Sequence, residues 1–144
     1  MKNFTRLVVC ASIALALGAM PAEAAGDLAI KATALTPLQL GIGDNDYALS
    51  VKEYRLETGK SYRLKISAGG YKKYEFQAPE FFRNIWVRKI VAGDVEIDAP
   101  TINALEFEEE SSIDLHFVPV RTGDYELNIE GLEEKGMVGK FVVR

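Results

Sequence analysis

The sequence has 144 residues, and 21 acidic residues outnumber 17 basic ones, so its formal net charge is −4. A chain this acidic is a poor candidate for binding nucleic acid, whose phosphates are recognised by Lys and Arg. With one cysteine it cannot form an internal disulfide, so its stability must come from an apolar core. The length is enough for one such core.

The first 24 residues are typical of a secretory signal peptide. Two basic residues precede an apolar run over 7–18, and the segment ends in the small-residue pattern A-x-A at 22–24. The sequence therefore predicts export to the periplasm and removal of residues 1–24. A retained membrane anchor is the alternative, although the apolar run is shorter than a typical membrane span.

The predicted mature chain, residues 25–144, is interpreted as a single domain. It contains no cysteine, because Cys10 lies in the leader. Cleavage removes two basic and one acidic residue, which leaves 15 basic residues against 20 acidic ones and a net charge of −5. No stable membrane span is expected after cleavage.

The mature sequence is dominated by short strand patterns. Apolar and polar residues alternate with period two in SYRLKIS, SIDLHFV and DYELNIE, as in half-buried strands. Glycine- and proline-containing turns separate the segments, a spacing typical of an antiparallel sandwich or barrel. One helical turn fits the segment PEFFRNIW. In chain order, the predicted strands are 28–34, 46–56, 61–67, 73–77, 85–91, 94–98, 102–107, 112–118, 124–130 and 138–143.

Charge divides the chain into two parts. Residues 52–90 carry ten basic and four acidic side chains, whereas residues 91–136 carry two basic and thirteen acidic ones. Solvated strand faces explain such a division, and this is the favoured interpretation. The alternative is that the asymmetry orients the protein on a partner.

The segment 123–143 (GDYELNIEGLEEKGMVGKFVV) resembles the ligand loop of the cupredoxin family, which includes plastocyanin and azurin. That loop follows the pattern G-x-Y-x-x-x-C-x-x-H-x-x-x-G-M-x-G-K before the last strand. The resemblance implies an all-β, cupredoxin-like Greek-key β-sandwich or barrel of about 7–8 strands. The matching residues are Gly123, Tyr125, Gly136, Met137, Gly139 and Lys140.

The resemblance also implies places for the ligands of a type 1 copper site, namely two His, one Cys and an axial Met. Ile129 stands at the Cys place, Leu132 at the loop's His place and Met137 at the axial place. The other His place falls on Tyr74, or on Lys73 if the match shifts by one residue. We therefore expect no type 1 copper and no other cofactor, and interpret Met137 as an apolar core residue rather than a ligand.

Other candidate residues are few. His116 lies on the outward series of its predicted strand, and a single His without a second ligand or a nucleophile makes no common metal or catalytic site. The sequence contains no set of residues typical of an enzyme.

Two surfaces are candidates for partner binding. Glu106, Glu108 and Glu110 alternate in one segment, and 94–98 carries a second alternating acidic set. If the two segments pair, they form one acidic face, which would be a docking face, a cation site or simply solvated. Phe81 and Trp86 lie among basic residues and would suit partner recognition. The favoured interpretation is instead that Phe82 and Trp86 fill the core.

The sequence as a whole predicts a non-enzymatic binding or accessory module with a cupredoxin-like fold. Its expected partner is another periplasmic protein, for instance a component of a redox system. The alternative is a protein that handles copper or another metal through non-standard ligands.

Overall fold

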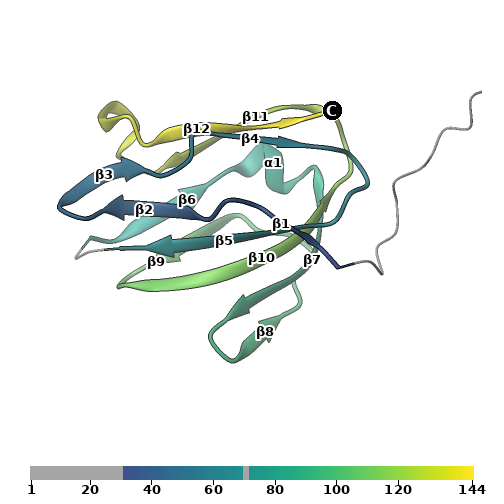
Figure 1. Ribbon diagram of the computed structural model, residues 1–144, viewed down its shortest axis with the longest axis horizontal. Coiled ribbons are helices and arrows are strands. Elements are labelled where there is room, and N and C mark those ends of the chain that lie inside the picture. Colours follow the sequence, from purple (N-terminus) through teal and green to yellow (C-terminus); the bar gives the residue numbers. More distant parts are fainter. Residues whose placement is uncertain (1–30, 70–71) are drawn as a thin grey trace, which may run out of the picture.

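The computed structural model describes residues 31–69 and 72–144. The predicted signal peptide and the beginning of the predicted strand 28–34 lie outside these residues. Within them, nearly all regular structure is strand (Figure 1). The elements are β1 (Thr33–Ala34), β2 (Leu38–Ile42), β3 (Asn45–Leu49), β4 (Glu53–Leu56), β5 (Tyr62–Ala68), β6 (Tyr74–Gln77), α1 (Pro79–Phe82), β7 (Ile85–Ala92), β8 (Val95–Ile97), β9 (Ala104–Phe107), β10 (Ser111–Pro119), β11 (Gly123–Ile129), η1 (Glu133–Lys135) and β12 (Val138–Val143).

The strands form two mixed sheets. Sheet A has the order β3-β2-β5-β10-β7-β8, and β1 also pairs with β5. Sheet B has the order β4-β12-β11-β6-β9. Figure 1 shows β4, β11 and β12 along the top, β10 crossing the lower half, and the β7–β8 hairpin extending below both layers. The predicted all-β sandwich is therefore confirmed.

The predicted alternation accounts for most of the core between the sheets. Leu64 and Ile66 of β5, Leu115 and Phe117 of β10, and Leu127 of β11 are all buried. Their apolar area, removed from water, provides the main stabilisation of a domain that has no disulfide.

One residue of β10 departs from the alternation. In the alternating segment SIDLHFV, Val118 is two residues after His116 and so belongs to the same outward series, yet Val118 is buried. It pairs in register with Trp86 of β7, next to a register shift between His116 and Phe117. Val118 and Trp86 therefore lie on the same face of sheet A, where Val118 is buried and Trp86 is 45% exposed.

The prediction also missed one strand and merged two others. Residues 38–42 form β2, whereas the predicted strand 46–56 divides into β3 and β4. The pairing of β2 with β3 shifts register between Leu40 and Ile42, where Gly41 has a φ of 75°. A strand that depends on a left-handed glycine produces only a weak pattern in the sequence.

The single helical turn, α1, fills the space between the sheets, as the segment PEFFRNIW predicted. Phe81 stacks on Phe141 of β12 with ring centroids 3.9 Å apart, and its edge meets Phe117 at 5.4 Å. Pro79 is pre-organised for the first turn of a helix. The turn thus places two aromatic side chains, Phe81 and Phe82, in the core.

Candidate functional site

Tyr74 of β6 occupies the place where the sequence resemblance expected a His. Its side chain is fully buried, and its hydroxyl donates to the carbonyl oxygen of Asp46 at 3.0 Å. The carbonyl oxygen of Gly69 lies 3.5 Å from the same hydroxyl. Burial, followed by the negative charge of Asp46, raises the pKa of Tyr74. Since Asp46 belongs to β3 of sheet A, this hydroxyl links the two sheets.

Gly41 leaves the space that the Tyr74 hydroxyl fills. A Cβ atom at position 41 would lie 2.4 Å from that hydroxyl and 2.7 Å from the carbonyl oxygen of Gly69. Glycine also adopts the positive φ at this position without strain. Lys73, the alternative His place, is exposed and points to the outer face, so only the register on Tyr74 leads into the core.

The other three ligand places lie on one hydrogen-bonded loop between β11 and β12. The N–H of Ile129 donates to the carbonyl of Met137 at 3.0 Å, and the N–H of Met137 donates to the carbonyl of Leu132 at 3.3 Å. The N–H of Leu132 in turn donates to the carbonyl of Ile129 at 3.0 Å. Ile129 and Met137 are fully buried, and Leu132 packs against the same core cluster, which also contains Tyr74. Backbone hydrogen bonds thus hold the three loop places together, and the fourth, Tyr74, lies on β6, the strand paired with β11.

A row of three carboxylates crosses the outer face of sheet B. Glu106 of β9 is in register with Glu75 of β6, and the N–H of Glu130, just after β11, donates to the carbonyl of Glu75 at 3.0 Å. The hydrogen bond that the protonated Glu130 carboxyl donates to the Glu75 carboxylate is the main reason that the pKa of Glu130 is raised. The pKa of Glu75 is lowered, chiefly by hydrogen bonds from Gln77 and Glu130. The two carboxyl groups are therefore coupled, with the pKa of Glu130 raised and that of Glu75 lowered.

Lys73 partly neutralises this acidic surface. Its ammonium contacts the carboxylates of Glu106 and Glu108, the latter at 3.1 Å, and the hydrogen bond to Glu106 is the main cause of its raised pKa. Glu110 is exposed and lines a separate hollow of about 400 Å³ with Lys65. We call Glu75, Glu106, Glu108 and Glu130 the acidic face.

The proposed pairing of the two acidic segments is wrong. The strand of segment 94–98, β8, is an edge of sheet A, whereas the strand that carries Glu106, β9, is an edge of sheet B. The chain between them crosses from one sheet to the other. Glu75 and Glu130 were not predicted as site residues, although both lie in predicted strands, because the pairing of strands is not encoded locally.

No protein-family model and no curated protein matches this sequence. Among solved structures, it is similar to a multicopper oxidase from Campylobacter jejuni, with a TM-score of 0.55 and 8% identity over 79% of this chain. A second multicopper oxidase gives a TM-score of 0.55 and 11% identity over 75% of this chain. The chain spans 30% and 42% of these two proteins. It has a cupredoxin fold. Auracyanin from Roseiflexus castenholzii, covered over 98% of its length, gives a TM-score of 0.48 and 14% identity over 79% of this chain.

We call the part of the fold that carries the four ligand places, Tyr74, Ile129, Leu132 and Met137, the ligand end. Its side chains differ from the ligand set of a type 1 copper site. Such a site needs a thiolate and two imidazoles. At these places the chain has the phenol of Tyr74, the alkyl groups of Ile129 and Leu132, and the thioether of Met137. The alkyl groups have no donor atom, so the residues present do not fit the site. In the described residues, no three or more His, Cys, Asp and Glu side chains cluster in a way that could hold a metal.

The aromatic residues next to the helical turn separate into buried and exposed ones. Phe81 and Phe82 are buried, whereas Trp86 is 45% exposed. Phe81 is therefore wrong as a partner-binding candidate, because it packs between the sheets of the cupredoxin fold. The interpretation that Phe82 and Trp86 fill the core is right for Phe82 and wrong for Trp86. Trp86 alternates with the buried Ile85 and Val87, and this alternation points it outward.

His116 lies on the outer face of sheet A, as its outward position predicted. It is half-buried and is in register with Arg63 of β5 and Lys89 of β7. Burial and then the charge of Lys89 lower its pKa, and Asp114 partly opposes this shift. Over the ranges 31–69 and 72–144, no helix is long and apolar enough to cross a bilayer.

Proposed function

We propose that this chain is an exported, non-enzymatic cupredoxin-like accessory module that does not bind type 1 copper and docks another periplasmic protein through its acidic face. The observation that carries the proposal is the filled ligand end. Tyr74, Ile129 and Met137 are fully buried there, and the Tyr74 hydroxyl bonds across the sheets. Filled in this way, the ligand end supports a structural role for these residues. We therefore look for the binding function on the surface of the domain.

Two properties of the acidic face support docking. Glu75 and Glu106 are directly opposite each other on neighbouring strands, an arrangement that destabilises a sheet unless a cation or a partner offsets the repulsion. Lys73 offsets part of it by contacting Glu106 and Glu108. Glu130 adds a further carboxyl, and the neighbouring Glu75 raises its pKa. A basic partner surface would relieve the remaining repulsion and would be attracted over a distance of about 8 Å at physiological ionic strength.

The test is a pull-down from periplasmic extract with immobilised protein. The wild type is compared with a Glu75→Lys and Glu106→Lys double variant. An Asp44→Lys and Glu57→Lys variant makes the same change in net charge at two exposed residues that are not part of the acidic face. We expect a specific protein to be captured by the wild type and by the control, and to be lost from the acidic-face variant and at high salt. If the wild type and both variants captured the same proteins, docking through this face would be contradicted.

Metal analysis of protein purified from its own periplasm tests the other half of the proposal. We expect no stoichiometric copper, because the four ligand places offer no thiolate and no imidazole. A stoichiometric metal would instead favour the metal-handling alternative.

A further inference from the structure

The β7–β8 hairpin extends beyond the part of the sandwich where the two sheets face each other (Figure 1). Its second strand, β8, is an edge of sheet A. Val95 is 58% exposed and Ile97 is 43% exposed, which makes them two of the most exposed large apolar side chains of the described residues. Exposed apolar side chains on an edge strand are unusual, because such an edge can pair with another chain.

These two side chains continue rows of the core. Leu115 is in register with Ile90, and Ile90 is in register with Ile97. Along this row the side chains change from buried at Leu115 and Ile90 to exposed at Ile97. Val95 lies on the same face, since it is separated from Ile97 by one residue. The hairpin therefore presents the inner, apolar surface of sheet A at a point where sheet B does not cover it.

The hydrogen-bonding edge of β8 is also free. Within the described ranges, β8 pairs with β7 alone. The turn between the two strands has two residues, so the backbone groups of Val95 and Ile97 face β7 and those of Glu96 face the open edge. An added strand would thus find backbone donors and acceptors beside two apolar side chains, which is the arrangement used in strand addition.

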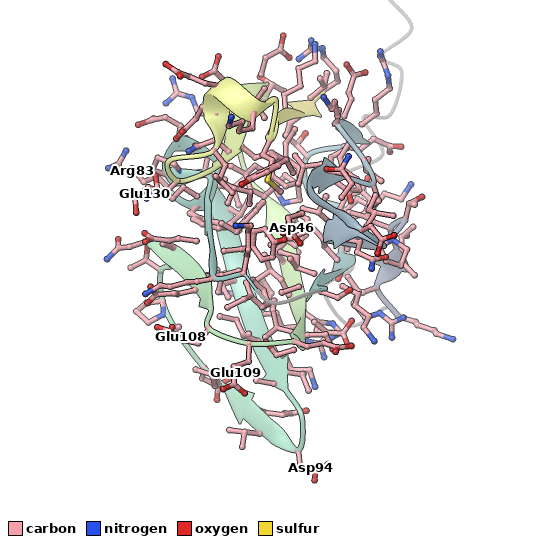
Figure 2. The ribbon with its side chains drawn as sticks, turned by 90° about the vertical axis from the view of Figure 1, so that its left-hand side faces the viewer. Asp46, Arg83, Asp94, Glu108, Glu109 and Glu130 are labelled. Atoms are coloured by element: carbon pink, nitrogen blue, oxygen red, sulfur yellow. The ribbon has the colours of Figure 1, made fainter. Side chains whose placement is uncertain are left out.

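Acidic residues predominate at this edge, and the basic residues Arg88 and Lys89 of β7 also lie near Glu96. Asp94 and Asp98 flank β8 at its two ends, and both are exposed. In Figure 2, Asp94 stands at the tip of the hairpin, and Glu108 and Glu109 lie in the same half of the view. The carboxylate of Glu96 contacts Lys89 of the hairpin itself. The charge around the edge favours a basic occupant.

The same charges disfavour a second copy of this chain. Two β8 strands paired antiparallel around Glu96 would place Glu96 opposite Glu96 and Asp94 opposite Asp98. Like charges directly opposite each other destabilise a strand pair. The edge is thus protected against self-association and remains open to a strand of opposite charge.

We propose that the open edge of β8 accepts an extended segment of the partner protein, in which basic residues alternate with apolar ones. The added strand pairs with β8, its apolar side chains cover Val95 and Ile97, and its basic side chains meet Asp94 and Asp98. This inference rests on the proposed docking function and adds a second contact with the partner, at an edge of sheet A, to the acidic face on sheet B.

The probe for the test is a capped peptide of about nine residues that alternates Lys and Val, because strands of this length are common. A second peptide has the same sequence but carries N-methyl groups on alternate amides, which block one hydrogen-bonding edge and keep the charge. Binding is measured by isothermal titration calorimetry and by amide chemical shifts. The site variant is Val95→Lys with Ile97→Lys. The matched control is Val120→Lys with Val138→Lys, whose wild-type side chains are 61% and 41% exposed.

We expect the Lys-Val peptide to bind the wild type and the control alike, with shifts centred on β8, and to bind the site variant about tenfold more weakly or worse. The N-methylated peptide should lose a similar factor. Absence of binding, equal binding of both peptides, or equal binding to the site variant would overturn the inference. If the pull-down partner is lost from the acidic-face variant but retained by the Val95 and Ile97 variant, docking stands and the β8 inference fails. If the peptide binds at β8 but nothing is captured, the docking function fails instead.

Discussion

Replacing Tyr74 by Phe removes a single oxygen atom from the filled ligand end and leaves the aromatic ring in place. The lost hydroxyl donates to the carbonyl of Asp46 at 3.0 Å and lies 3.5 Å from the carbonyl of Gly69. Because the side chain is fully buried, no water can take the place of the hydroxyl without a shift of the surrounding chain. The substitution therefore tests whether this hydroxyl holds the two sheets together.

The expected loss of stability in Tyr74→Phe follows from the hydrogen bond to the Asp46 carbonyl. One such bond contributes about 0.5–1.5 kcal/mol, and a buried acceptor left without a donor costs about 1–3 kcal/mol. Asp46 is half-buried, so we expect a decrease in the free energy of unfolding of about 1–2 kcal/mol. For a domain of this size, that lowers Tm by roughly 4–8 °C. Urea unfolding followed by circular dichroism measures the loss, and Tyr47→Phe, at a half-exposed tyrosine, should change stability by less than about 0.5 kcal/mol.

A second substitution tests the position of the hydroxyl without depending on the absolute loss in the free energy of unfolding. Gly41→Ala places a Cβ atom 2.4 Å from the Tyr74 hydroxyl and 2.7 Å from the Gly69 carbonyl oxygen, at a φ of 75°. In the Tyr74→Phe background the first of these clashes disappears, while the contact with Gly69 and the strain remain. The two substitutions should therefore be less harmful together than the sum of their separate effects, by about 1 kcal/mol. Additive losses would refute the placement of the hydroxyl over Gly41.

The remaining predictions concern the core, the ligand end and two titrating groups. Ile129→Ala should lower the free energy of unfolding by about 2–5 kcal/mol, as for other large-to-small core substitutions, and a negligible change would mean that position 129 is open. Titration with Cu(II) should produce no intense charge-transfer absorption in the visible range, since none of the four ligand places has a thiolate; a blue protein would contradict this. Because Glu75 raises the pKa of Glu130 in the folded protein, the stabilisation from protonated Glu130 is present in acid and lost as pH rises through that pKa. At neutral pH the free energy of unfolding of Glu130→Gln should then exceed that of the wild type, and the difference should shrink in acid. Urea unfolding at both pH values measures this difference, and a difference that does not change with pH would contradict the prediction. The pKa of His116, followed by NMR, should lie below 6.5 and rise in Lys89→Gln; a value that does not respond would exclude Lys89 as a cause.

Strands with one buried face could be predicted from the sequence because their alternation is local. β5, β10 and β11 were recognised in this way, and their inward residues form the core. β2 was missed because it bends at Gly41, where a register shift replaces simple alternation. The position of Trp86 could have been predicted from its alternation with Ile85 and Val87, but its size was taken as evidence for burial.

The acidic face could not be predicted, because it depends on contacts between residues far apart in the sequence. Glu75 and Glu106 are 31 positions apart and become neighbours only through the pairing of β6 with β9. Lys73, which the charge division assigned to the basic half, contacts Glu106 and Glu108 of the acidic half. The division of charge along the chain therefore did not predict that a basic residue, Lys73, lies on a surface formed mainly by acidic residues.

Two surface features of this protein cost stability without serving the fold. The opposed carboxylates of Glu75 and Glu106 repel each other, and the open edge at Val95 and Ile97 exposes apolar area beside unpaired backbone groups. Elsewhere local preference and tertiary structure agree, since the alternating residues are buried and the ligand end is filled. Departures from such agreement concentrate where a protein binds something. Substitutions that remove either feature should therefore stabilise the isolated domain and weaken its binding to the partner. If a substitution at one feature destabilises the domain or leaves binding unchanged, that feature is not part of the binding surface.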